Sequence, residues 1–210
     1  MKTEQLVEAL VADRGKPRPL GRSLGLALAA GAALSLVLFF VELGVRADIG
    51  PALATWRFDL KVAMVLLGLG LAFGVCLDCA RPDRLRHPLR RLLPLAAVLA
   101  LAVAIELVSV PAASWERRLV GTNSMICLPM VPLLSLVPLV AALVILRRGA
   151  PVSPALAGAA AGLLAAFCGA SLYAFHCFDD SPLFVATWYT LAVIPVVALG
   201  ALAGHRLLRW

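Results

Sequence analysis

Two of the five cysteines in this chain stand where they could react together. Cys127 opens a long apolar run, and Cys177 follows the next such run in the loop FHCFDDSP. If both runs cross a membrane, the two thiols emerge at the same face and at one depth. On an outward, oxidising face they could form a disulfide, which requires Cα atoms within about 4.4–6.8 Å of each other.

The loop around Cys177 also concentrates groups that bind metal ions. Imidazole, thiol and carboxylate donors stand within five residues, at His176, Cys177, Asp179 and Asp180. Together with Cys127, this set could hold a borderline or soft metal ion. The alternative is a stabilising disulfide beside solvated acids. The residues alone therefore leave a redox pair, a metal site and a structural bond open.

The remaining cysteines carry less chemistry. Cys76 and Cys79 form the motif CLDC at the end of another apolar run. The spacing is that of a dithiol motif, but no thioredoxin-like βαβ pattern surrounds it, and this end is predicted below to face the reducing cytoplasm. We interpret these two as small helix-end residues, and Cys168 as a small apolar packing residue.

The elements that position these residues are six long apolar runs. Hydrophobic residues make up 62% of the 210 residues, whereas an ordinary soluble domain is about half apolar. A helix needs roughly 20 residues to cross a hydrocarbon core about 30 Å thick. We therefore predict an all-α membrane domain over residues 23–210, with helices at about 24–45, 60–77, 92–111, 126–146, 154–175 and 183–204. Gly158, Gly162 and Gly169 permit close contacts, so we expect the fifth helix to be central.

The distribution of basic residues predicts the orientation of the bundle. Positive residues in short loops stay on the cytoplasmic side during insertion. If the amino terminus is inside, 14 of the 19 basic residues are cytoplasmic, and the other five are Arg46, Arg57, Lys61, Arg117 and Arg118. The sequence thus predicts that both termini face the cytoplasm. The net charge of +7 then serves topology and contact with anionic headgroups rather than nucleic-acid binding.

Acidic residues fall near or beyond the outer ends of the predicted helices. Glu42, Asp59 and Glu106 could pair with Lys61 in a polar layer just inside the outer boundary. We prefer the alternative, a set of snorkelling helix ends with one ion pair. None of these acids falls at mid-bilayer, where pumps and proton relays carry buried ionisable residues. A small-solute or metal transporter is disfavoured for this reason and because no internal repeat is evident.

Residues 1–22 form a cytoplasmic tail whose first part is predicted to be a short amphipathic helix. Leu6, Val7, Leu10 and Val11 recur at i, i+1, i+4 and i+5, which places them on one helical face. A helix of about eleven residues is marginal in water, so it needs a partner. Glu4 and Glu8 make an anionic membrane surface a poor one. We expect this segment to bind a groove on another protein, with these six residues at the contact.

These segments resemble the NrsF-type membrane anti-sigma factors of proteobacteria, which are negative regulators of extracytoplasmic-function sigma factors. The resemblance spans nearly the whole chain and includes MKTEQLVEAL, NSMICLPMVPLLSLVPL, LRRGAP, YAFHCFDDSPLFVATWY and GHRLLRW. It implies a multi-pass protein of the bacterial inner membrane that holds a sigma factor inactive at its cytoplasmic face and releases it under metal or oxidative stress. It further implies that Cys127 and Cys177 sense the stress and that the tail helix contacts the sigma factor.

We therefore expect a sensor and tether, not an enzyme. No cofactor is certain, although the outer cysteines could bind a metal ion. A membrane thiol oxidoreductase that passes electrons from the outer cysteines to a quinone is the main alternative. It would need a reactive pair and a cofactor site, but CLDC is on the wrong face and the outer cysteines are far apart in sequence. Pro129, Pro132 and Pro138 can kink the fourth helix. They either make it a two-state coupling element or only shape a static helix.

Overall fold

The computed structural model describes Gln5, Glu8, residues 19–81 and residues 88–209, and throughout this part of the chain the regular structure is helical. Six helical segments are long and apolar enough to cross a membrane. They are α2 (Leu20–Glu42), α4 (Trp56–Cys79), η1 with α5 (Pro88–Leu92 and Leu93–Ser109), α7 (Ser124–Leu146), α8 (Pro154–Tyr173) and α9 through η3 to α10 (Pro182–Phe184, Val185–Tyr189 and Thr190–Leu207). For the described residues, the predicted all-α architecture and the six helices long enough to cross a membrane are confirmed, and the orientation of the termini stays a prediction.

The helix limits differ from the predicted ones by a few residues, for local reasons. The first membrane helix begins at Leu20, inside the predicted tail, and ends at Glu42 because Gly44 takes a φ of +70°, a conformation that ends helices. The second begins at Trp56 rather than at residue 60. There the Thr55 side chain accepts a hydrogen bond from the Phe58 backbone N–H and caps the helix.

Helix α8 lies at the centre of the bundle, as predicted. It packs against α10, α7 and α4, while α2 packs mainly against α7. The contact with α10 is close because glycines face each other. A Cβ atom on Gly158 would overlap the carbonyl oxygen of Gly200, and one on Gly162 would overlap that of Val196. Small residues therefore bring the two backbones together.

Helix α7 remains continuous although it contains Pro129, Pro132 and Pro138. A proline at position 138 removes the N–H that would otherwise bond to the carbonyl oxygen of Leu134. The buried Ser35 hydroxyl of α2 donates to that oxygen at 2.8 Å. The α2–α7 contact thus satisfies a backbone group that the proline leaves free in a medium without water.

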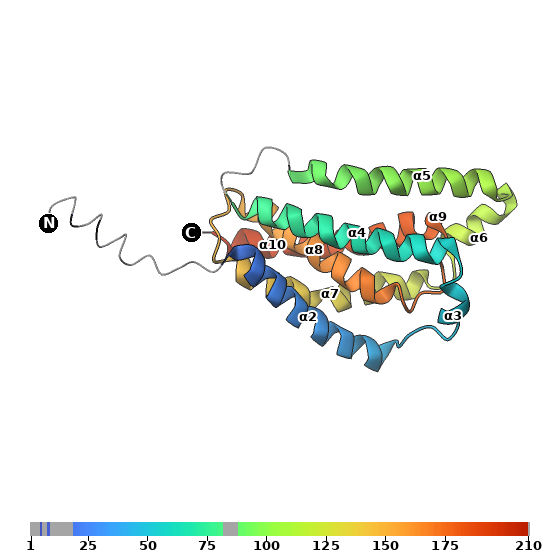
Figure 1. Ribbon diagram of the computed structural model, residues 1–210, viewed down its shortest axis with the longest axis horizontal. Coiled ribbons are helices and arrows are strands. Elements are labelled where there is room, and N and C mark those ends of the chain that lie inside the picture. The colour runs from blue at the N-terminus through green and yellow to red at the C-terminus, as the bar shows by residue number, and fades with distance from the viewer. Residues whose placement is uncertain (1–4, 6–7, 9–18, 82–87, 210) are drawn as a thin grey trace.

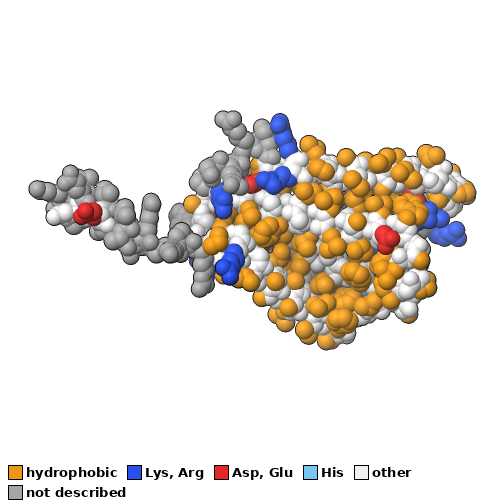
Figure 2. All heavy atoms as spheres, viewed as in Figure 1, with side chains coloured by type: hydrophobic (Ala, Val, Ile, Leu, Met, Phe, Trp, Pro, Cys, Tyr) orange, Lys and Arg blue, Asp and Glu red, His pale blue; other side chains and the backbone are white. Residues whose placement is uncertain are grey.

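The first long helix begins and the last one ends at the same end of the bundle. Helix α2 begins where α10 ends, and the short helices α3 (Ile49–Ala52), α6 (Trp115–Val120) and α9 lie at the opposite end (Figure 1). On the visible face, apolar side chains cover the long flank, and Lys and Arg gather at the two ends (Figure 2). Helix α5 runs along the outside and buries only Ala102 and Glu106. The surface therefore has an apolar band between two polar ends, as expected of a protein that spans a lipid bilayer.

Candidate functional site

The two cysteines predicted to face outward meet in one buried cluster, at the end of the bundle opposite the start of α2 and the end of α10. Cys127 lies in the first turn of α7, and Cys177 lies in the loop that follows α8. Both thiols are free and fully buried. They share a cluster with Tyr173 and Tyr189, whose ring centroids lie 5.9 Å apart. The structure thus brings together the pair that the sequence singled out, without a bond between the sulfurs.

Two buried cations hold the main chain at Cys177. The Lys61 ammonium donates to the Cys177 carbonyl oxygen at 2.8 Å and pairs with Asp180 at 2.5 Å. The Arg46 guanidinium donates to the same carbonyl oxygen at 2.9 Å and pairs with Asp180 at 2.9 Å. Its other nitrogens pair with Asp48. We call Arg46, Asp48, Lys61 and Asp180 the Asp180 cluster. It joins the loop after α2, helix α4 and the Cys177 loop.

A second buried carboxylate lies beside this cluster. Glu106 has no exposed side-chain surface and pairs with Arg57 and Arg118, each at 3.0 Å. The Ser181 hydroxyl donates to it at 3.3 Å. We call these four residues the Glu106 cluster. Ser181 follows Asp180 in the chain, so the two clusters share one loop.

These clusters correct two expectations about the outer acids. Lys61 pairs with Asp180 rather than with Glu42, Asp59 or Glu106. The preferred interpretation, snorkelling helix ends with one ion pair, is also wrong, because Lys61 and Glu106 are buried. A charge that leaves water needs a partner and further hydrogen bonds, and both side chains have them.

Asp179 and His176 fasten the Cys177 loop to its neighbours. The Asp179 carboxylate accepts hydrogen bonds from the backbone N–H groups of Thr122 and Asn123, each at 2.8 Å. Nδ1 of His176 lies 3.1 Å from the Gly44 carbonyl oxygen. Gly121 has a φ of +61°, and a Cβ atom there would overlap the Asp179 carboxylate. The turn before α7 therefore depends on a glycine for its conformation and for space.

Three of the predicted metal donors, His176, Asp179 and Asp180, are already engaged in these contacts. Among the described residues, no three His, Cys, Asp or Glu side chains converge in a way that could hold a metal ion. Asp180 forms ion pairs with Arg46 and Lys61, and Asp179 accepts hydrogen bonds from the turn before α7. The arrangement does not itself form a metal centre, and metal binding at Cys127, His176, Cys177, Asp179 and Asp180 stays a prediction.

The surroundings set the protonation of the loop groups. Burial raises the pKa of the Cys177 thiol to about 11, although the Lys61 cation opposes this shift. The hydrogen bond to Asp48 raises the pKa of Arg46, and the same bond lowers the pKa of Asp48. At neutral pH, Cys177 is therefore a protonated, weakly nucleophilic thiol beside a charged cluster.

The other predicted site residues lie elsewhere or outside the described residues. Leu6, Val7, Leu10, Val11 and Glu4 lie outside them. Glu8 is helical and exposed. Cys76 and Cys79 are buried near the end of α4, in the core cluster that contains Leu24, and Cys168 is buried in α8. The interpretation of these three as packing residues agrees with their burial.

Sequence reasoning missed that Arg46, Arg57 and Arg118 belong to the site. A signal was present, because these residues are exceptions to the positive-inside distribution. Of the five basic residues left on the outer face, four enter the Asp180 and Glu106 clusters. A cation that topology does not require points to a structural or functional partner.

Comparison with known proteins places the chain in a family. A family model described as "Negative regulator of sigma F" (NrsF) matches residues 10–210. The probable anti-sigma-F factor NrsF of Azospira oryzae is 34% identical over 215 aligned residues, and the anti-sigma-F factor NrsF of Caulobacter vibrioides is 34% identical over 218. Both alignments cover 100% of this chain and of the relative. No solved structure matches. This chain therefore belongs to the NrsF family of anti-sigma factors, which are regulators rather than enzymes.

Proposed function

We propose that this membrane protein holds an extracytoplasmic-function sigma factor inactive at the cytoplasmic face of the bacterial inner membrane. Release follows when metal or oxidative stress acts on Cys127 and Cys177 at the outer face. Family membership supports the regulatory role. The observation that carries the sensing role is the pair of free, buried thiols in one cluster, with the Cys177 main chain held by two cations from different elements.

The place of the tail in the sequence, directly before α2, supports a sigma contact at the end opposite the thiols. Residues 1–22, with the apolar stripe of Leu6, Val7, Leu10 and Val11, precede and enter the start of α2. This is the end where α10 also finishes (Figure 1). The tail stripe needs a partner to be stable as a helix. A sigma factor held there is kept at the membrane and away from its polymerase.

The contacts around Cys177 supply a route to α2. The loop after α2 bonds to the Cys177 loop through Arg46, whose backbone N–H donates to the Phe175 carbonyl oxygen at 3.0 Å. His176 contacts Gly44 of the same loop. A displacement of Cys177 therefore acts on one end of α2, and the tail precedes the other end, about 35 Å away for 23 residues. Transmission requires that this connection has two stable arrangements.

The packing at the thiols explains why a chemical change there would displace the loop. Both side chains are fully buried among Tyr173, Phe184 and Tyr189. A buried core tolerates added volume poorly. Joining the sulfurs would release two electrons and two protons to an oxidant and draw α7 toward the loop. A soft metal ion could reach its ligands only after Asp179 or Asp180 leaves its present partners.

Serine substitution of the two cysteines tests the sensing role. We expect Cys127→Ser and Cys177→Ser to keep sigma-dependent transcription low under oxidant or metal stress, whereas the wild type responds. Cys76→Ser and Cys168→Ser, also at buried thiols, serve as controls that respond normally. A normal response in both outer-cysteine variants, with protein levels equal to wild type, would contradict the proposal.

Co-purification from the native cell tests the partner and its contact together. A sigma factor should be recovered with the full chain and lost when residues 1–20 are deleted. A milder variant, Leu6→Glu with Leu10→Glu, keeps the tail length and removes the apolar stripe. Recovery of the sigma factor with both variants would place the contact elsewhere, for example in the second cytoplasmic loop.

A further inference from the structure

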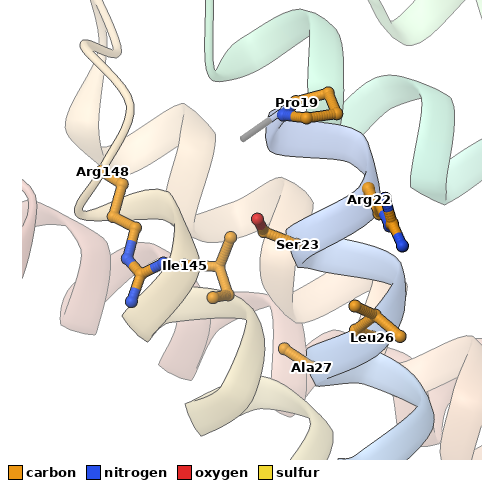
Figure 3. Close-up of a pocket in the computed structure, with 7 residues that line it drawn as sticks. All are labelled: Pro19, Arg22, Ser23, Leu26, Ala27, Ile145 and Arg148. Atoms are coloured by element: carbon orange, nitrogen blue, oxygen red, sulfur yellow. The ribbon is translucent and has the colours of Figure 1, made fainter. Parts of the chain in front are cut away.

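A groove of about 640 Å³ opens between α2 and α7 at the end of the bundle that carries both termini. Arg22, Ser23, Leu26 and Ala27 line it from α2, and Ile145 and Arg148 line it from α7 and the residues that follow it (Figure 3). Ser23 and Ile145 face each other across the groove, and Arg148 lies on its α7 side (Figure 3). Arg22 also lines the groove, from the edge of α2 that is turned away from α7 in this view (Figure 3).

The groove exists because α2 leaves α7 in its first turns. In the middle of the span the helices touch, since a Cβ atom on Gly31 would lie 3.1 Å from the Cα of Pro138. Nearer its start, α2 also contacts α4, where a Cβ atom on Gly21 would lie 3.5 Å from the Leu77 side chain. The gap that remains on the α7 side is therefore built into the helix packing.

The lining changes from cationic to apolar with depth. Arg22 and Arg148 are exposed, and among the described residues neither pairs with a carboxylate. Leu26 lies about 6 Å farther along the span than Arg22, given a rise of 1.5 Å per residue. It is 65% exposed in a helix with the length and composition of a membrane span. The groove is therefore lined by cationic side chains at the depth of the lipid headgroups and by apolar side chains at the depth of the acyl chains.

We propose that this groove binds an anionic phospholipid. The phosphate binds at the mouth of the groove, which Arg22 and Arg148 both line, and an acyl chain follows Leu26, Ala27 and Ile145. Guanidinium suits phosphate because it offers several N–H donors in a plane, and the Ser23 hydroxyl adds another donor at the boundary. Basic pockets between membrane helices are recognised headgroup sites. A soluble acidic partner would leave the lower, apolar half of the groove unused.

Native mass spectrometry of the full chain in detergent tests the proposal. The protein is titrated with phosphatidylglycerol, with phosphatidylcholine of the same chains and with sn-glycerol 3-phosphate. We expect phosphatidylglycerol to bind, and Arg22→Gln with Arg148→Gln to weaken that binding about 30-fold, since each basic residue at the surface strengthens it several-fold. Neither phosphatidylcholine nor the free headgroup should match it.

The matched control is Arg90→Gln with Arg206→Gln, which removes the same charge from two exposed arginines that do not line the groove. It should change binding by less than about twofold, because neither side chain lines the groove. Equal weakening by both pairs would mean a diffuse basic collar and would overturn the site. Equal binding of phosphatidylcholine would overturn the role of the phosphate.

A measurement on the unsubstituted protein guards against misfolded variants. Phosphatidylglycerol with a photoactivatable acyl chain is crosslinked in vesicles, and the labelled peptides are identified. Label concentrated in residues 19–31 and 138–148 is the expected result. Label spread evenly over all six spans would contradict a defined site.

Discussion

Lys61 holds its ammonium group between the Asp180 carboxylate and the Cys177 carbonyl oxygen, and its side chain has no exposed surface. Its removal from water is offset only while these acceptors stay in place. Asp180 also accepts from Arg46, so one carboxylate balances two cations. Lys61 therefore contacts the main chain of Cys177, one of the two proposed sensor residues. A small displacement of the Cys177 loop would have a large electrostatic cost at this lysine.

Replacing Asp180 with asparagine should therefore destabilise the fold strongly. Asp180→Asn leaves Lys61 buried without a counter-ion, and breaking a buried pair in this way costs about 3–5 kcal/mol. The free energy of unfolding, measured in detergent micelles by denaturant titration, reports the loss. Asp48→Asn is the control. It removes another partner of Arg46, but that carboxylate is about half exposed, so its loss should matter much less.

Similar unfolding curves for the two variants would show that Lys61 finds another acceptor when Asp180 is lost.

The Cys177 thiol should show an unusually late pH dependence. Its pKa of about 11 means that the folded protein keeps the proton where an unfolded cysteine loses it. We expect its alkylation by iodoacetamide to rise about tenfold per pH unit from pH 7 to 10, because only the thiolate reacts. Peptide mass spectrometry measures the rate at this position. The raised pKa also implies stability that is present below the unfolded pKa and lost as the pH rises toward 11.

Unfolded protein in the same experiment provides the comparison, and its reaction should level off about two pH units earlier. A plateau near pH 8 in the folded protein would show that Lys61 outweighs burial.

Sequence reasoning reached the thiols but not the groups around them. Cys127 and Cys177 could be placed at one depth, because each stands at the end of an apolar run of known length. The partners of Lys61 could not be derived, since they depend on which helices are neighbours, and no local periodicity encodes that order. Arg46 was visible only as an unexplained outer cation.

At the scale of the helices, the long apolar runs predicted the membrane spans. Capping residues explain why the observed helices begin and end a few residues from the predicted limits. The segment Val185–Tyr189 is different. It forms a π-helical turn that no sequence pattern predicted. Its last residue, Tyr189, packs in the cluster that contains both thiols. Such turns arise from an extra residue in a helix and are frequent at functional sites. Its conformation depends on tertiary packing, which the sequence pattern does not specify.

The α2–α7 contact makes a prediction at this scale. Ser35→Ala removes the donor to the Leu134 carbonyl oxygen, and leaving that buried acceptor unsatisfied should cost about 1–2 kcal/mol. Pro138→Ala restores a backbone N–H for the same oxygen. In the Pro138→Ala background, Ser35→Ala should therefore cost less than about 0.5 kcal/mol. A double-mutant cycle of unfolding free energies in detergent measures the difference.

Additive effects in that cycle would mean that the serine contributes by packing alone. Thr190→Val, at a described helical position away from α2, checks that loss of a hydroxyl has no general effect.

In the whole molecule, charge is distributed for two purposes. The end where α2 begins and α10 finishes carries exposed arginines such as Arg22, Arg147 and Arg206, which the positive-inside rule predicts to be cytoplasmic. The opposite end carries arginines that are consumed in buried pairs and therefore oppose insertion less than their number suggests. The predicted membrane orientation rests on the first group, and the proposed sensing rests on the second.

This division predicts the result of reporter fusions. Green fluorescent protein fused after Trp210 should fluoresce, and alkaline phosphatase fused there should be inactive, because both termini are expected in the cytoplasm, where folding of the first and reduction of the second occur. Insertion of each reporter after Thr122, an exposed residue in the turn before α7, should give the opposite pattern. Equal protein amounts are verified by immunoblot.

If phosphatase were active at residue 210 and silent at 122, Cys127 and Cys177 would face the cytoplasm, and a sensor of external stress could not be built from them. If the pattern is as expected, the same fusions in the Asp180→Asn chain separate a folding defect from an altered orientation, since a change in stability leaves the topology set by the arginines at the other end unchanged.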